Sequence, residues 1–263
     1  MRRSVRKTLL LLLLALAAAA RGADIAMDPA TADKVARIVA TRVLPYAGEP
    51  HGKTLTRVSA AFLGTRYQAS TLIGSPREPE ELVANFAGVD CFTYVDYVEA
   101  LSRSRDRQSF LQNLARIRYV DGRVGYLSRR HFFSDWFATA PRNALDITQR
   151  LSPHYRTVQK QLNQRPGGGE FIPGLGIRPR SINYIPGNAI DAAVVEKLQE
   201  GDYVGIYSPL AGLDVTHVGI VVRHDGQLWF RDASSLAAER KVMDSPFLAY
   251  VRQKPGIVVL RSE

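Results

Sequence analysis

The sequence predicts an α+β fold, with helices in its first half and strands in its last third. Apolar residues recur at helical spacing after Asp28 and again after Asp90, and both aspartates are good helix N-caps. Residues 202–207 and 214–222 instead form short runs rich in β-branched and aromatic side chains, which is typical of strands. We therefore expect helices and strands to pack together in one domain that spans residues 24–263.

The other segments are expected to follow the same division. A proline directly follows Asp28, as at the first position of a helix, and a second helix is expected to stop at Gly64. Residues 81–86 fit a strand or a helical turn. Further helices are expected around residues 110–117, 155–164 and 190–198. The aromatic run at 124–137 is typical of core, and the proline- and glycine-rich run at 165–180 is either a mobile lid or a surface loop without regular structure.

Residues 1–20 are expected to be a signal peptide. Four basic residues precede an apolar run at 9–20 that is too short to span a bilayer comfortably, and the run ends in alanines suited to cleavage after residue 20 or 23. No cysteine follows to carry a lipid, and no second long apolar stretch is present. We expect an exported protein, periplasmic or extracellular, with no stable membrane anchor once the signal is removed.

Composition limits the ligands that we expect. The formal charge of the chain is +10, and it falls to +5 without residues 1–23, which hold five basic and no acidic residues. This charge suits association with an anionic envelope polymer. The sequence has no basic run with interleaved aromatics, no phosphate-binding glycine loop and no Cys/His cluster spaced for zinc. We therefore expect no nucleic acid, no metal and no cofactor.

Cys91, the only cysteine, is a candidate nucleophile. Because Asp90 would cap the helix, Cys91 falls in its first turn, where unpaired N–H groups and the helix dipole favour a thiolate. The alternative is a buried cysteine that acts as a small hydrophobe. An exported protein with one cysteine has either an intermolecular bridge or a reactive thiol, and export favours the second reading.

His217 and Asp232 are the candidate base and orienting acid. His217 lies in the strand at 214–222, and a four-residue loop at 223–226 would bring the strand at 227–232 back beside it. In that register His217 is directly opposite Asp232 on one face, whereas a slip by one residue would separate them. The other histidines are expected in turns, near a helix start or in the aromatic run; they are His51, His131, His154 and His224.

Cysteine, histidine and aspartate together support amide hydrolysis. The imidazole of His217 would accept the thiol proton, the thiolate would attack a carbonyl carbon, and Asp232 would fix the tautomer of the ring. The backbone N–H of Cys91 would bind the oxyanion.

The motifs resemble those of NlpC-type, papain-like cell-wall cysteine peptidases, and within them the N-acetylmuramoyl-L-alanine amidase-like branch. The resemblance implies a helix that carries Cys91, packed on a small antiparallel sheet that supplies His217, with Tyr67 beside the nucleophile as a substrate-binding residue. The third catalytic position of these enzymes is commonly His, sometimes Asn or Gln, whereas this chain has Asp232. The matching segments are Phe62-Leu63-Gly64-Thr65, Asp90-Cys91-Phe92-Thr93-Tyr94-Val95, His131-Phe132-Phe133, Asp135-Trp136, Tyr184-Ile185-Pro186, Gly201-Asp202, Thr216-His217-Val218-Gly219-Ile220 and Phe230-Arg231-Asp232-Ala233-Ser234-Ser235.

The resemblance implies an exported hydrolase that acts on peptidoglycan or muropeptides. It favours the bond between N-acetylmuramic acid and L-alanine, with the D-glutamyl–diaminopimelate bond of the stem peptide as the alternative. A non-catalytic wall-binding module is the third possibility, and the oligomeric state stays open.

Overall fold

The computed structural model describes residues 24–262, so the expected signal peptide lies outside the described residues. Four longer helices make up most of the N-terminal half: α1 (Pro29–Ile38), α2 (His51–Ala60), α3 (Cys91–Ser102) and α4 (Arg107–Arg118). Short elements connect them, namely β1 (Ile25–Met27), η1 (Val39–Val43), η2 (Leu44–Tyr46), β2 (Arg66–Tyr67), β3 (Leu82–Ala84) and β4 (Gly88–Val89). Among the described residues, no helix is long and apolar enough to cross a membrane.

The C-terminal half builds an eight-stranded sheet in which every pairing is antiparallel. The strand order is β11-β10-β9-β8-β12-β7-β6, and β5 pairs with β12 beside this path. The sheet is thus larger than the small one that the resemblance implied. Its strands are β5 (Ala144–Asp146), β6 (Arg156–Leu162), β7 (Arg178–Pro186), β8 (Tyr203–Tyr207), β9 (Val215–His224), β10 (Gln227–Ala233), β11 (Val242–Pro246) and β12 (Gly256–Ser262).

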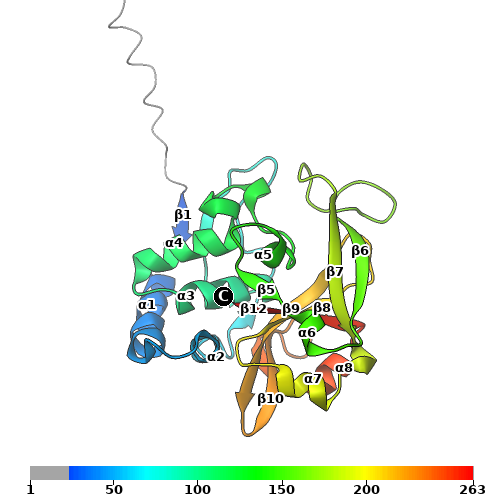
Figure 1. Cartoon of the computed structure of the whole chain (residues 1–263). Helices are drawn as coiled ribbons and strands as arrows, with labels where there is room; N and C mark the ends of the chain where they lie inside the picture. The colour runs from blue at the N-terminus through cyan, green and yellow to red at the C-terminus, as the bar shows by residue number, and fades with distance from the viewer. Residues whose placement is uncertain (1–23, 263) are drawn as a thin grey trace, which may run out of the picture.

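Short helices complete the described chain. Figure 1 shows α1 to α4 grouped on one side of the molecule, with the sheet beside them and α7 and α8 low in the view, next to β10. The mixed helix and strand composition that the sequence predicted is confirmed. The bounds are η3 (Val120–Gly122), η4 (Tyr126–Ser128), α5 (Asp135–Ala138), α6 (Thr148–Leu151), η5 (Gly187–Ala189), α7 (Ala192–Lys197) and α8 (Phe247–Arg252).

Two apolar cores cover the two faces of the sheet. Strand side chains alternate between faces, so Val218 and Ile220 of β9 lie in the core shared with α1 to α4, whereas Val221 lies in the core shared with α7 and α8. Tyr94 and Val98 pack α3 into the first core and are fully buried. Burial of this face holds α3 against β9 and β10.

The register predicted for the β9–β10 hairpin is wrong by two residues. The turn contains two residues, Asp225 (φ 51°) and Gly226 (φ 71°), and His224 pairs with Gln227. Asp-Gly in the left-handed region is typical of the type I′ turn, whose twist matches that of the flanking strands. The Asp225-Gly226 pair is the sequence signal for a two-residue turn, and the predicted four-residue loop at 223–226 does not take it into account.

The helix predicted at residues 155–164 is also wrong. This segment instead contains β6, which pairs with β7 from Arg156↔Tyr184 to Leu162↔Arg178. Several residues there, such as Gln159 and Lys160, are good helix formers, but the long-range pairing overrides this local preference. The irregular run therefore ends earlier than expected, since residues 178–180 already belong to β7. The remaining residues form the loop that joins the two strands (Figure 1).

Candidate active site

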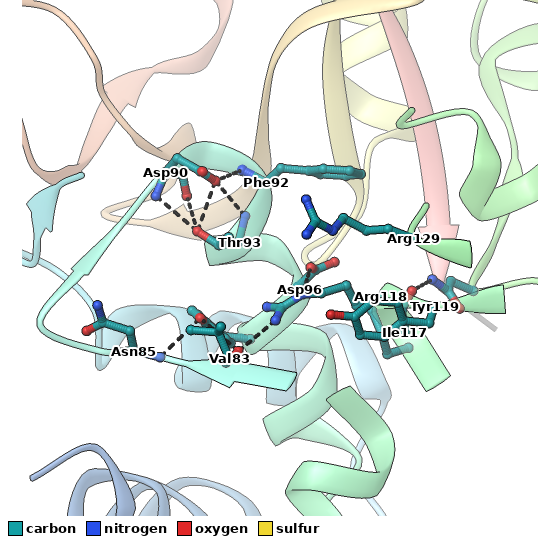
Figure 2. A network of polar contacts seen from close by, with 12 residues as sticks. Val83, Asn85, Asp90, Phe92, Thr93, Asp96, Ile117, Arg118, Tyr119 and Arg129 are labelled. Carbon is teal, nitrogen blue, oxygen red and sulfur yellow. Dashed lines mark hydrogen bonds and ion pairs between the residues drawn. The ribbon is translucent and has the colours of Figure 1, made fainter. Parts of the chain in front are cut away.

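Cys91 is the first residue of α3, and its half-buried thiol is free. Asp90 caps the helix, because its Oδ1 accepts hydrogen bonds from the backbone N–H groups of Phe92 (3.0 Å) and Thr93 (2.7 Å). The Thr93 hydroxyl accepts one from the backbone N–H of Asp90 (3.0 Å), which completes a capping box (Figure 2). The predicted cap and the predicted position of Cys91 in the first turn are confirmed.

These hydrogen bonds leave one donor beside the thiol. A helix begins with N–H groups that have no intrahelical partner. The capping box satisfies those of Asp90, Phe92 and Thr93, and the N–H of Tyr94 donates to Asp90 O (3.0 Å). Within residues 24–262, the N–H of Cys91 is the one in this turn that these bonds leave for a ligand.

His217 and Asp232 lie on the same face of the β9–β10 hairpin. The imidazole Nε2 is 2.7 Å from Asp232 Oδ2, and the side chains are only 14% and 3% exposed. Continuation of the observed register would place Asp232 opposite Gly219, two residues from His217. A shift of two residues keeps both side chains on one face, whereas a shift of one would not. The pair therefore forms by a diagonal contact rather than by the direct opposition that the sequence predicted.

The charged form of His217 is favoured in this environment. Burial alone lowers the pKa of an imidazole, but hydrogen bonds with Asp232 and with the Cys91 thiol outweigh it and raise the pKa of His217 to about 10. Because Asp232 occupies Nε2, the ring nitrogen left for the thiol is Nδ1.

A small cavity joins the thiol to the imidazole. Its volume is about 160 Å³, which is room for about five water molecules at 30 Å³ each. Phe92, Phe133 and Val215 make one part of the lining apolar, and Cys91 and His217 supply the reactive groups. The remaining lining residues are His131, Thr216 and Val218.

Tyr67 lies close to Cys91 in the fold. β2 pairs in parallel with β4, and this register puts Tyr67 next to Val89, two residues before Cys91. Burial raises the pKa of Tyr67, and the negative charges of Cys91 and Asp90 raise it further. Cys91, His217, Asp232 and Tyr67, which were singled out from the sequence, are thus gathered in one place.

A buried ion pair holds α3 in position behind the thiol (Figure 2). The Arg118 guanidinium, on α4, donates to Asp96 Oδ2 on α3 (2.8 Å) and to the Val83 carbonyl on β3 (2.6 Å). The side chains of Arg118 and Asp96 are 1% and 6% exposed, so solvent screens this ion pair little. A single guanidinium thus fixes β3, α3 and α4, which follow one another closely in the chain, to one another.

Sequence reasoning did not single out His131. It was assigned to the aromatic core, but its ring lines the cavity, and its Nε2 lies 2.7 Å from the Tyr126 carbonyl oxygen. Burial lowers the pKa of His131, which keeps the ring neutral. The available signal was the His131-Phe132-Phe133 segment, which is one of those that resemble the cell-wall enzymes.

No group of three or more His, Cys, Asp and Glu side chains among residues 24–262 is arranged to hold a metal ion. The chemistry that these residues offer is that of a thiol, an imidazole and a carboxylate.

This structure is similar to several solved structures. An N-acetylmuramoyl-L-alanine amidase from Bacteroides uniformis ATCC 8492 is 29% identical, with a TM-score of 0.66 over 81% of this chain and 99% of that one. A protein from Legionella pneumophila str. Philadelphia 1 is 20% identical, with a TM-score of 0.74 over 89% and 94%. A candidate xylanase from Bacteroides fragilis is 28% identical, with a TM-score of 0.64 over 77% and 98%. No curated protein sequence matches the chain.

The fold and these similarities define the class, which is that of the amidase-like hydrolases of peptidoglycan. The family model described as AmiA-like, N-acetylmuramoyl-L-alanine amidase-like, matches residues 57–257. The chain belongs to this family. The amidase-like branch of the resemblance is therefore confirmed.

Proposed function

We propose that this protein is an exported peptidoglycan amidase with a papain-like fold and a Cys91–His217–Asp232 triad. The bond cut is that between N-acetylmuramic acid and L-alanine, and residues 1–20 are the signal peptide. The observation that carries the proposal is the cavity shared by the Cys91 thiol and an imidazole whose other nitrogen is held by Asp232.

The first chemical step forms a thioester. His217 Nδ1 takes the proton of the Cys91 thiol, and Sγ attacks the carbonyl carbon of the lactyl amide. The carbonyl electron pair moves onto oxygen, and the N–H of Cys91 and the Tyr67 hydroxyl donate hydrogen bonds to that oxyanion. As the oxyanion collapses, the C–N bond breaks and the imidazolium protonates the departing amine of L-alanine.

The second step releases the sugar. His217 removes a proton from water, the hydroxide attacks the thioester carbonyl, and the C–S bond breaks. The lactyl group leaves as a carboxylic acid, and the thiolate–imidazolium pair is restored. Throughout both steps, Asp232 keeps the proton on Nε2 and leaves Nδ1 directed at sulfur.

The cavity supports amide rather than glycosidic hydrolysis. Glycosidases use two carboxyl groups about 5–9.5 Å apart across the scissile bond. The described lining of the cavity holds a thiol and two imidazoles and no carboxylate.

Mass spectrometry of a defined muropeptide tests the proposed bond. We expect incubation with the mature protein to release the intact peptide, starting at L-alanine, from the sugar. A cut between D-glutamate and diaminopimelate would instead assign the protein as a stem endopeptidase. An unchanged muropeptide would contradict both activities and favour a wall-binding module.

The role of Asp232 predicts a shift in the pH profile. The carboxylate helps to raise the pKa of His217, so the imidazolium that protonates the leaving amine persists to high pH. Asp232→Asn removes that charge and lowers the pKa of His217. The alkaline limb of kcat/KM against pH should therefore move down by about one to three pH units.

The hairpin offers a matched control for this measurement. Asp225 contacts His224 Nδ1 at 3.0 Å in an exposed His–Asp pair on the same hairpin. Asp225→Asn should leave the profile unchanged. Superimposable profiles for Asp232→Asn and the wild type would contradict the proposed triad.

A further inference from the structure

Arg240 lies at the edge of the candidate active site, on the segment between β10 and β11. Its guanidinium sits 4.8 Å from the centroid of the Tyr67 ring. Tyr67 in turn is close enough to Cys91 for the thiolate charge to act on its hydroxyl, while Arg240 acts in the opposite sense. The ring of Tyr67 thus lies next to the Arg240 guanidinium and within electrostatic range of Cys91.

The backbone holds Arg240 there in a conformation that costs free energy. Its φ is 49°, in the left-handed region that glycine adopts readily and other residues rarely do. Two hydrogen bonds maintain it: Arg240 N–H donates to Leu236 O (3.0 Å), and Tyr67 N–H donates to Arg240 O (2.8 Å). Strained residues of this kind are concentrated at functional sites.

The charge of Arg240 is available to a ligand. The side chain is exposed, and within the described residues it forms no ion pair. Its neighbours differ: Arg231 is bound bidentately by Asp244 at 2.7 and 2.8 Å, and Arg66 donates to Gln68 Oε1 (2.8 Å). Of these three guanidinium groups, that of Arg240 is the one left without an acceptor.

We propose that Arg240 binds a carboxylate of the stem peptide and so selects anionic stems at this active site. A guanidinium that lies over an aromatic ring keeps its planar fork of N–H donors for a ligand, and that fork matches a carboxylate in bidentate geometry. The peptide released by the proposed reaction continues from L-alanine into D-glutamate, whose free α-carboxylate is the nearest anionic group to the cut. The inference rests on the proposed function and names the part of the substrate that the site recognises.

Two muropeptides that differ in one group test this recognition. One carries the D-glutamate α-carboxylate, and in the other that carboxylate is amidated. Hydrogen bonds to charged groups predict that amidation lowers wild-type kcat/KM by about 10- to 100-fold, chiefly through KM. Arg240→Gln should show this loss already with the carboxylate substrate and no further loss on amidation. Arg240→Lys, which keeps the charge but not the planar fork, should fall between the two.

Arg240→Gly separates recognition from structural support. Glycine relieves the left-handed strain, so the melting temperature should stay level or rise, while KM rises as in Arg240→Gln. Arg223→Gln, at an exposed position of β9, is the matched control and should leave the response to amidation unchanged.

The outcomes distinguish this inference from the proposed function. If wild type and Arg240→Gln both cut the two muropeptides, and amidation lowers kcat/KM by the same factor in each protein, the proposed role of Arg240 is wrong. The proposed amidase activity would stand. If neither muropeptide is cut, calorimetry with Cys91→Ser and Cys91→Ser/Arg240→Gln still measures binding. Tighter binding of the carboxylate form only where Arg240 is present would uphold the inference, and equal affinities would overturn it.

Discussion

Cys91→Ser is expected to lower kcat/KM for a muropeptide by at least about 1000-fold while the protein stays folded. A serine hydroxyl at the same place remains protonated near neutral pH, because a hydroxyl ionises far less easily than a thiol. The protonated hydroxyl is a poor nucleophile. The side chain is half-buried at a helix start, and oxygen replaces sulfur with little change in packing, so the free energy of unfolding should hardly change.

Wild-type turnover by Cys91→Ser would require a different nucleophile. Because Cys91 is the only cysteine, iodoacetamide offers a second readout with no background from other thiols. Alkylation of the wild type should abolish turnover with one label per chain. A fully labelled protein that still cuts muropeptides would contradict the mechanism.

Arg118→Met is expected to reduce the free energy of unfolding by about 3–5 kcal/mol. The substitution leaves Asp96 buried with no countercharge, and removal of one partner of a buried ion pair is costly for that reason. The double variant Asp96→Leu/Arg118→Met should recover most of the loss, since it removes both charges and fills the site with apolar atoms. Urea unfolding followed by circular dichroism measures each value.

An exposed ion pair serves as the control. Arg123 Nη2 lies 3.8 Å from Asp121 Oδ2, and the side chains are 76% and 58% exposed. Arg123→Met should cost less than about 1 kcal/mol. A loss for Arg118→Met no larger than that would show that the buried pair does not hold α3 to α4.

Local signals in the sequence were sufficient for the start of α3. Asp90 caps this helix through its own side chain, and the cap depends on residues within three positions of it. The same holds for α1, which begins at Pro29. Asp28 caps it, because its Oδ1 accepts a hydrogen bond from the backbone N–H of Thr31 (2.8 Å) in the first turn. The position of Cys91 could therefore be derived without tertiary contacts.

Long-range pairing is what the sequence could not supply. β6 was assigned to a helix because its partner, β7, lies beyond the proline- and glycine-rich loop. The sequence places His131 in the core, because most of the other residues that line the cavity belong to α3 and β9, which are far from His131 in the chain. The His217–Asp232 contact was reached from a register that is wrong, and it survived only because the error was an even number of residues.

That even number limits how the hairpin can change in length. Side chains of a strand alternate, so the count of residues between His217 and Asp232 decides whether carboxylate and imidazole share a face. Loss or gain of a single residue within one strand, with the turn pairing kept, would put Asp232 on the opposite face, towards the core shared with α1 to α4. A change of two residues would keep the carboxylate on the same face but place it either directly opposite His217 or four residues away from it, depending on the direction. The exposed turn is thus free to vary, whereas the two strands cannot change in length by one residue without separating His217 from Asp232.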